Sequence, residues 1–268
     1  MHIQVNGANI NVKQSGNPSG LPVVFIHGFP FSHAMWDDQA KTAGERFHVL
    51  TYDIRGHGMS DIGDGQYTNE GHVDDLFALL AALNIEKPVI VGLSMGGYIA
   101  LRALERDQTR FRAAVLCDTR SESDPNEAKL KRFGVIAAVK RTGSEAFAND
   151  FAKAVFSPGA ESRVPEAVNF IKSIIGHTPP LSIAGNQLAL ASRTDTTASL
   201  ASIKIPVLIL VGEHDQTTPV AASKAMHARI PGSQFFVIPN AAHMSNLENP
   251  AVFNAKLMEF LTGLAKQP

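Results

Sequence analysis

Short, dense apolar runs recur along the chain and alternate with polar or amphipathic stretches. The runs are Leu21–Ile26, Phe47–Tyr52, Pro88–Gly92, Ala113–Cys117, Ile205–Val211 and Gln234–Ile238. Runs of this kind are typical of strands buried on both faces, as in parallel sheets. Between them lie helical patterns with apolar residues three and four apart, such as Val73, Leu76, Phe77, Leu80 and Leu83. The alternation predicts an α/β fold with a mostly parallel central sheet and helices on both faces.

The first dozen residues have a different pattern. Apolar residues alternate with polar ones on either side of Asn6-Gly7, a dipeptide that favours a type I′ turn because both central residues adopt positive φ. A β-hairpin is therefore predicted at the start of the chain.

One long stretch lacks any strand-like run. From 120 to 202 we find only helical patterns, punctuated by prolines, and we interpret this stretch as a helical cap inserted into a core of residues 1–119 and 203–268. The cap's phenylalanines are expected to form mainly its own core, with the others lining a pocket: Phe133, Phe147, Phe151, Phe156 and Phe170.

Composition narrows the function. The 268 residues are 44% hydrophobic and 18% charged, which suits a folded globule, and 24 Lys plus Arg against 25 Asp plus Glu leave a net charge of −1. No basic surface for nucleic acid or anionic lipid is expected. With Cys117 as the single cysteine, no apolar run long enough to span a membrane and no signal-like segment, we expect a soluble, cytoplasmic protein. A homo-oligomer is left open.

The sharpest motif is Gly92-Leu93-Ser94-Met95-Gly96-Gly97, directly after a predicted strand and before a helical pattern. Glycines two residues before and after Ser94 permit a sharp strand-to-helix turn that exposes the hydroxyl above the sheet. The hydroxyl would lie at a helix N-terminus, where the free amides and the helix dipole favour developing negative charge. Ser94 is therefore the candidate nucleophile.

A serine nucleophile requires a base, and the base requires an acid that holds its tautomer. Of ten histidines, His243 fits because it follows the last predicted strand, and Asp215 follows the strand before it. The chain order is then Ser94, Asp215, His243. The three-histidine spacing of a zinc site is absent, and neither a metal nor a cofactor is expected.

At this point the sequence resembles the α/β-hydrolase superfamily, and within it the group of 3-oxoadipate enol-lactonase, small carboxylesterases and cofactor-free perhydrolases. The matching segments span nearly the whole chain: His27-Gly28-Phe29-Pro30, Asp53-Ile54-Arg55-Gly56-His57-Gly58-Met59-Ser60, the serine turn, Gly212-Glu213-His214-Asp215 and the loop of His243. The resemblance implies the α/β-hydrolase fold with a helical cap.

It also implies an oxyanion hole made by the backbone N–H groups of Met95 and Phe29, each worth about 3 to 4 kcal/mol in the transition state. His27 is read as a residue that fixes the Phe29 loop. Asp53 and Arg55 are read as organisers of a turn. Asp118 follows a strand end where some relatives carry the acid, but Asp215 is preferred.

The leading hypothesis is a serine hydrolase that cleaves carboxylic esters or lactones through an acyl-enzyme on Ser94. Alternatives on the same residues are enol-lactone opening, perhydrolysis, cleavage of carbon–carbon bonds in diketones and acyl transfer to another acceptor. An enol-lactonase needs cations for its substrate's carboxylate, for which Arg132, Arg141 and Arg193 are available. A ligand receptor with this fold is the alternative outside enzymes.

Overall fold

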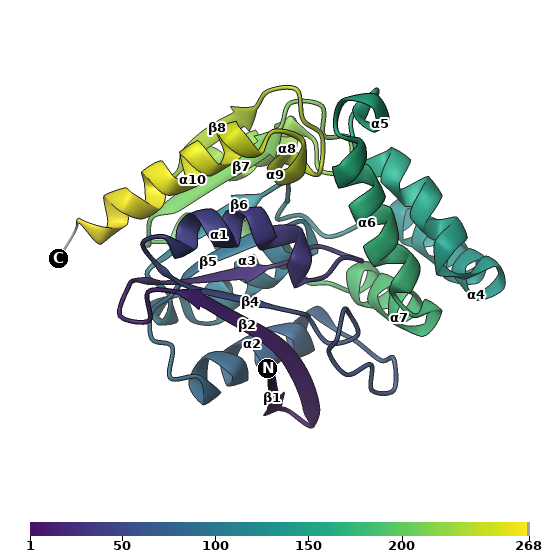
Figure 1. Ribbon diagram of the computed structural model, residues 1–268, viewed down its shortest axis with the longest axis horizontal. Helices are drawn as coiled ribbons and strands as arrows, with labels where there is room; N and C mark the ends of the chain where they lie inside the picture. Colours follow the sequence, from purple (N-terminus) through teal and green to yellow (C-terminus); the bar gives the residue numbers. More distant parts are fainter. Residues whose placement is uncertain (267–268) are drawn as a thin grey trace.

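A twisted eight-stranded sheet runs through the protein (Figure 1). The computed structural model describes residues 1–266. The strands, in the spatial order β1-β2-β4-β3-β5-β6-β7-β8, are β1 His2–Val5, β2 Ala8–Gly16, β3 Pro22–Ile26, β4 His48–Tyr52, β5 Val89–Leu93, β6 Ala113–Cys117, β7 Val207–Gly212 and β8 Gln234–Ile238. Strand β2 pairs antiparallel with β1 and β4, and the other pairs are parallel. The predicted mostly parallel sheet is confirmed.

The N-terminal hairpin is also confirmed. Asn6 and Gly7 connect β1 to β2 with φ of 46° and 74°, as a type I′ turn requires. All six apolar runs form strands, and their observed ends differ from the predicted ones by two residues at most.

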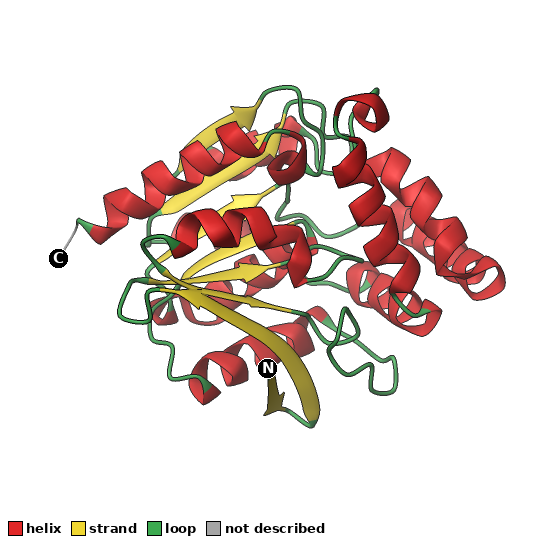
Figure 2. Cartoon of the chain, viewed as in Figure 1, coloured by secondary structure: helices red, strands yellow, loops and turns green. Residues whose placement is uncertain are grey.

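Helices cover both faces of the sheet (Figure 2). One face packs against α1 Asp37–Gly44 and α10 Pro250–Ala265, and the other against α2 Asn69–Ala82, α3 Met95–Asp107 and α8 Val220–His227. Alternate residues of one strand serve the two sides: Val23 and Phe25 belong to the first core, and Val24 and Ile26 to the second. Shorter helices are η1 His33–Trp36, η2 Gln108–Arg110, η3 Thr197–Ser202 and α9 Ser245–Glu248.

Residues 118–206, all of them described, contain no strand. They carry α4 Asn126–Val155, α5 Ala160–Arg163, α6 Pro165–His177 and α7 Pro180–Ala191, which we call the helical insertion. Helix α4 packs along α6 and α7, and the group lies beyond the carboxyl ends of the parallel strands (Figure 1). The division into a core and a cap at 120 and 202 stays a prediction.

The two chain segments that lead into and out of the helical insertion are joined to each other. The Thr196 N–H donates to the Ser121 carbonyl at 3.1 Å, and the Ser123 N–H donates to the Asp195 carboxylate at 3.0 Å. The hydroxyls of Ser121 and Thr197 lie 2.9 Å apart. We call these segments, 121–123 and 195–197, the neck of the helical insertion.

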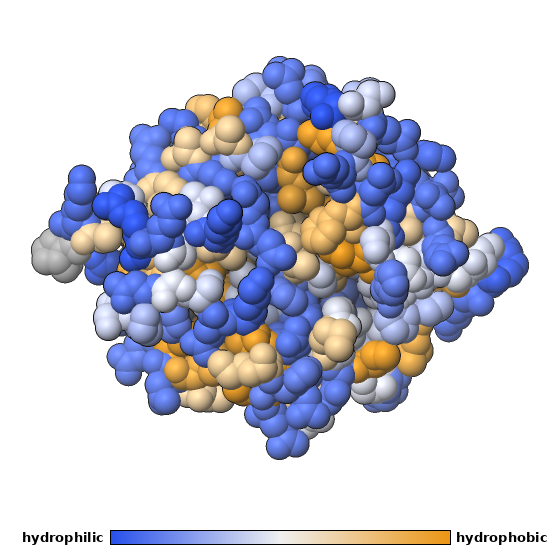
Figure 3. Space-filling view, in the orientation of Figure 1, coloured by the Kyte–Doolittle hydropathy of each residue, from blue (hydrophilic) through white to orange (hydrophobic). Residues whose placement is uncertain are grey.

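The surface in Figure 3 is mostly hydrophilic, with hydrophobic areas gathered beside α6 and in smaller patches elsewhere. Within residues 1–266, no helix is both long and apolar enough to cross a bilayer.

Candidate active site

Ser94 lies in the sharp turn between β5 and α3. Its φ of 53° and ψ of −114° are strained for a residue with a side chain. The turn closes tightly because its glycines lack a Cβ: an added Cβ at Gly92 would lie 2.3 Å from the Gly96 carbonyl oxygen, and one at Gly96 would lie 2.1 Å from the Ile26 carbonyl oxygen. Glycine at both positions is thus required by contact with neighbouring backbone.

Hydrogen bonds from the next strand hold the backbone of Ser94. Its N–H donates to the Cys117 carbonyl at 3.0 Å, and the Thr119 hydroxyl donates to the Ser94 carbonyl at 2.9 Å. Met95 is the first residue of α3, so its N–H has no acceptor within the helix. The turn therefore fixes the backbone of Ser94 beside the first N–H groups of α3, which can donate hydrogen bonds to a negatively charged group.

His243 and Asp215 form a buried pair. The Nδ1 atom of His243 lies 2.8 Å from Asp215 Oδ2, and both residues are 2% exposed. Because the carboxylate accepts the Nδ1 proton, Nε2 of the neutral ring remains able to take a proton. This is the tautomer that a general base beside a serine needs.

Asp215 is surrounded by further donors. Its Oδ1 accepts from the N–H groups of Thr217 and Thr218 at 2.8 and 3.0 Å, and its Oδ2 accepts from the Thr218 hydroxyl at 2.8 Å. Burial raises the pKa of Asp215, but the His243 charge and these hydrogen bonds lower it by more, so the net shift is downward. The group is therefore held as a carboxylate.

The three residues predicted as nucleophile, acid and base follow β5, β7 and β8, whose carboxyl ends meet at one edge of the sheet. Their catalytic roles stay predictions. Phe29 lies on the loop after β3 at the same edge, since β3 neighbours β5, and it is 5% exposed.

His27 supports the Phe29 loop. Its Nε2 accepts the Ile54 N–H at 2.9 Å, and its Nδ1 lies 2.8 Å from the Gly28 carbonyl, so both ring nitrogens are occupied. Burial lowers the pKa of His27 to about 4. The ring is neutral near pH 7 and has no free nitrogen to act as a base.

Asp118 makes hydrogen bonds with residues other than His243. It is fully buried at the end of β6, where its carboxylate accepts the Gly212 N–H at 2.8 Å and the Ser245 hydroxyl. Burial, together with the charge of Asp215, raises the pKa of Asp118 well above its usual value. The geometry places Asp215, and not Asp118, against the imidazole.

The turn at 53–60 has structural contacts. The buried carboxylate of Asp53 accepts the backbone N–H groups of His33 and Met59 at 2.7 and 2.9 Å, so it joins two loops. Arg55 makes an ion pair with Asp75 at 2.8 Å. These contacts agree with an organising role.

The aromatic side chains of the helical insertion differ from the expectation. Phe147 and Phe151 reach the core, with ring centroids 6.3 and 5.9 Å from that of Phe29. Phe133 and Phe170 are 49% and 39% exposed. The expectation is wrong for Phe133 and Phe170, which face solvent. Phe147 and Phe151 pack on each other, with ring centroids 5.1 Å apart, as well as on Phe29. Phe147 and Phe151 thus connect the helical insertion to the Phe29 loop.

Two arginines named for substrate binding are paired instead. Asp124 accepts from Arg193 at 2.5 Å and from Arg132, and the Arg193 guanidinium lies 4.1 Å from the centre of the Tyr98 ring. Arg141 is exposed. The charge of Asp124 thus partly neutralises both Arg132 and Arg193.

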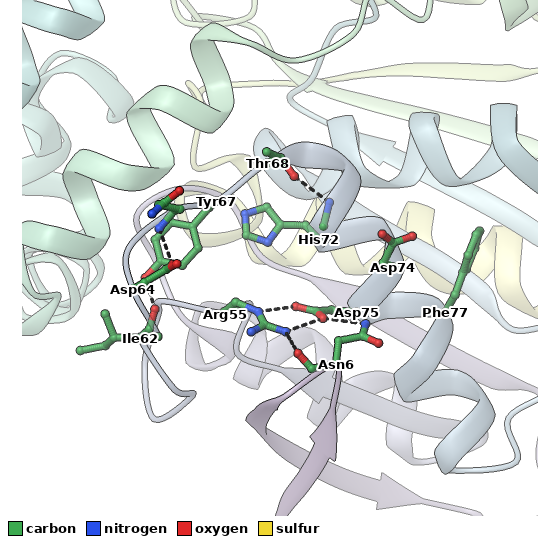
Figure 4. Close-up of a pocket in the computed structure, with 13 residues that line it drawn as sticks. Asn6, Arg55, Ile62, Asp64, Tyr67, Thr68, His72, Asp74, Asp75 and Phe77 are labelled. Atoms are coloured by element: carbon green, nitrogen blue, oxygen red, sulfur yellow. Dashed lines mark hydrogen bonds and ion pairs between the residues drawn. The ribbon is translucent and has the colours of Figure 1, made fainter.

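A hollow of about 680 Å³ lies between the β1–β2 turn and the start of α2 (Figure 4). Its wall includes Asn6, Tyr67 and His72 and the paired side chains of Arg55 and Asp75. None of the five predicted site residues lines it. The hollow is therefore separate from the predicted chemistry.

Sequence reasoning missed several contacts around the site. The contacts of Asp215 with Thr217 and Thr218 could have been predicted, because an aspartate side chain in a loop commonly accepts from the backbone N–H groups two and three residues later, as in an Asx turn. The contacts of Ser245 with Asp118 and of Phe151 with Phe29 join distant parts of the chain and leave no local signal.

Comparison with known proteins identifies the family of the fold. A family model described as alpha/beta hydrolase fold matches residues 22–250. The 3-oxoadipate enol-lactonase 1 of Acinetobacter baylyi is 29% identical over 97% of this chain and 94% of its own length, and a non-heme chloroperoxidase of Kitasatospora aureofaciens is 30% identical over 96% and 97%. The structure of a thermophilic esterase from Thermogutta terrifontis superposes with a TM-score of 0.94 at 33% identity, covering 99% of this chain and 100% of that one. This chain belongs to the α/β-hydrolase fold family and is a hydrolase.

Proposed function

We propose that this protein is a serine hydrolase that cleaves small carboxylic esters or lactones through an acyl-enzyme on Ser94. The observation that carries the proposal is the buried hydrogen bond between His243 and Asp215 at the same sheet edge as the strained serine turn. The three groups come from the ends of three strands that meet at one edge of the sheet, which is how a parallel sheet can bring a nucleophile, a base and an acid together.

In the proposed reaction His243 Nε2 takes the Ser94 hydroxyl proton while the oxygen attacks the substrate carbonyl. Negative charge forms on the carbonyl oxygen, where the N–H groups of Met95 and Phe29 would stabilise it. The imidazolium then donates its proton to the leaving alkoxide, and the ester C–O bond breaks. Water, deprotonated by His243, attacks the carbonyl of the acyl-enzyme. The bond from the acyl carbon to the Ser94 oxygen breaks, the carboxylic acid leaves, and the imidazolium returns its proton to Ser94. Asp215 stays ionised and stabilises the imidazolium.

The pairing of Arg132 and Arg193 with Asp124 bears on the substrate. A substrate carboxylate would compete with Asp124 for these cations, whereas a neutral acyl group would not. We therefore propose neutral esters and lactones as the substrate class, ahead of lactones that carry a free carboxylate. The 29% identity to an enol-lactonase favours the carboxylated lactone as the second candidate.

The test compares wild type with Ser94→Ala on p-nitrophenyl acetate, butyrate and octanoate at neutral pH. Removal of a triad nucleophile should lower kcat by about 10⁶-fold and leave only the residual acceleration that the oxyanion hole and substrate binding supply. Equal rates in the two proteins would overturn the proposal. Tight ligand-dependent thermal stabilisation without product would then point to a receptor.

The substrate class is tested with a matched pair, a neutral γ-lactone and the same ring with a carboxymethyl substituent. A higher kcat/KM for the neutral lactone supports the proposal. Preference for the carboxylated lactone, abolished in Arg193→Met, would support the enol-lactonase reading instead. Peracid formation from acetate and hydrogen peroxide, and product partition with added alcohol, measure perhydrolysis and acyl transfer on the same enzyme.

A further inference from the structure

Glu248 is a buried carboxylate that the proposed chemistry does not use. It ends the short helix α9, five residues after His243, and its side chain is 0% exposed. A buried charge is costly unless donors surround it, and five hydrogen bonds from other residues reach this one. The desolvation cost of burying Glu248 is therefore offset by contacts whose role the proposed reaction does not explain.

The donors come from two separate parts of the molecule. The N–H of Ala242, adjacent to His243, donates to Glu248 Oε1 at 2.8 Å. From the helical insertion, the Ser157 hydroxyl and the Arg163 guanidinium donate to Oε2 at 2.5 and 2.6 Å. Glu248 therefore joins the His243 loop to the segment that follows α4.

The loop is bound to the helical insertion at two further points, one on each side of His243. Arg163 Nη2 donates to the Asn240 carbonyl at 3.1 Å, and the Met244 N–H donates to the Val155 carbonyl at 3.2 Å. Residues before and after His243 are thus tied to segment 155–163. The imidazole is held by Asp215 at one ring nitrogen and by this junction through its backbone.

We infer that Glu248 is a positioning residue that holds the His243 loop against the helical insertion, and this rests on the proposed role of His243 as the base. Through Ser157 and Arg163, the placement of the insertion sets the placement of the imidazole. Glu248 touches neither substrate nor His243 side chain in this scheme. Its effect on rate is geometric.

The test uses Glu248→Gln in the full-length protein. This isosteric change keeps an acceptor for Ala242 but removes the charge that Arg163 pairs with. We expect kcat for p-nitrophenyl acetate to fall about 10- to 100-fold with KM within about twofold, since a displacement near 1 Å of a catalytic group can cost this much. Hydrogen–deuterium exchange in the peptide covering 239–248 should become faster, because the loop opens more readily.

A matched control is Asn186→Ala. Asn186 in α7 makes a buried hydrogen bond with His72 of α2 at 3.0 Å, so it joins the insertion to the core without contacting the His243 loop. It should lower the melting temperature but leave kcat and exchange in 239–248 near wild type. An equal loss of kcat in this control would overturn the inference in favour of general destabilisation.

A double-mutant cycle measures whether Glu248 acts on the His243 loop through Arg163. If Glu248 acts through Arg163, then Arg163→Met combined with Glu248→Gln should lower kcat no more than the worse single change does. Fully additive losses would contradict the shared path. Should Glu248→Gln fail to fold, Ser157→Ala removes a single donor and is scored by the same two measurements.

The outcomes separate the two proposals. Unchanged exchange in 239–248, or faster exchange with unaltered kcat, overturns the positioning role while the serine mechanism stands. A wild type no faster than Ser94→Ala overturns the proposed function. Exchange then still decides whether Glu248 holds the loop.

Discussion

At the scale of single residues, Asp215 gathers four donors on two oxygens: His243, the two N–H groups that follow it and the Thr218 hydroxyl. Such a carboxylate can hold an imidazole in one tautomer without becoming protonated itself. Asp118, one strand away, has its own donors and a raised pKa. The pKa values of the two acids are therefore shifted in opposite directions, and only Asp215 contacts the imidazole.

This difference predicts unequal effects of substitution. Asp215→Asn should lower kcat for ester hydrolysis by about 10³- to 10⁴-fold, because the amide favours the wrong tautomer of His243. Asp118→Asn should lose far less, since the Asp118 side chain accepts from the Gly212 N–H and the Ser245 hydroxyl, whereas it is Asp215 that holds the imidazole. Steady-state kinetics at pH 7.5 compare the loss of kcat in the two variants. The reverse ranking would make Asp118 the acid.

Candidate site residues could be predicted from the sequence where they directly follow a strand. Ser94, Asp215 and His243 each follow a predicted strand, and parallel strands bring their carboxyl ends to one edge. The residues it missed act through contacts between remote segments: Ser157 and Glu248 are 91 positions apart. A single sequence carries no periodicity or spacing that reports such a pair.

At the scale of elements, the connection from β5 to α3 depends on backbone-to-backbone contact. We expect Gly96→Ala to destabilise the fold by about 1–3 kcal/mol or more, because the new Cβ would overlap the Ile26 carbonyl oxygen and push β3 from α3. The free energy of unfolding in urea and the kcat of the same sample measure both consequences. An alanine variant with wild-type stability and rate would contradict this account of the turn.

Gly134 provides the matched control. It lies inside α4, where an added Cβ meets nothing within 4 Å. Gly134→Ala should raise the free energy of unfolding by about 0.5–1 kcal/mol, since alanine loses less backbone entropy in a helix. Urea titration of both glycine variants side by side gives opposite signs if the contact argument holds.

Strands were more predictable than the helical insertion for a physical reason. A strand buried on both faces must be apolar throughout, so its sequence shows where it lies. The helices of the insertion are amphipathic, and the same phenylalanine can face its own bundle, the core or solvent. Phe151 reaches Phe29 while Phe133 is exposed, and their spacing alone did not distinguish them.

At the scale of the whole molecule, two buried histidines link stability to pH. Burial lowers the pKa of His27 and of His72 to about 4, against 6.5 for an exposed histidine. As the pH falls below 6.5 the unfolded chain takes up these protons and the folded protein does not. The free energy of unfolding should therefore be highest above pH 6.5, as far as these groups contribute, and fall toward pH 4.

Urea titrations from pH 7.5 to 4.5 measure this loss. His72→Gln keeps a donor for Asn186 but does not titrate, so its stability should depend less steeply on pH than that of wild type. Parallel curves for the two proteins would show that His72 does not contribute.

The neck of the helical insertion has a consequence for protein engineering. Because segments 121–123 and 195–197 are hydrogen-bonded to each other, the chain leaves the core and re-enters it at nearly one point. Segments whose ends lie close together are the ones that tolerate exchange between homologous scaffolds. A chimera cut at the neck could receive the corresponding helices of another member, and with them a new preference for acyl groups, while the serine turn and the strand-end loops stay in place.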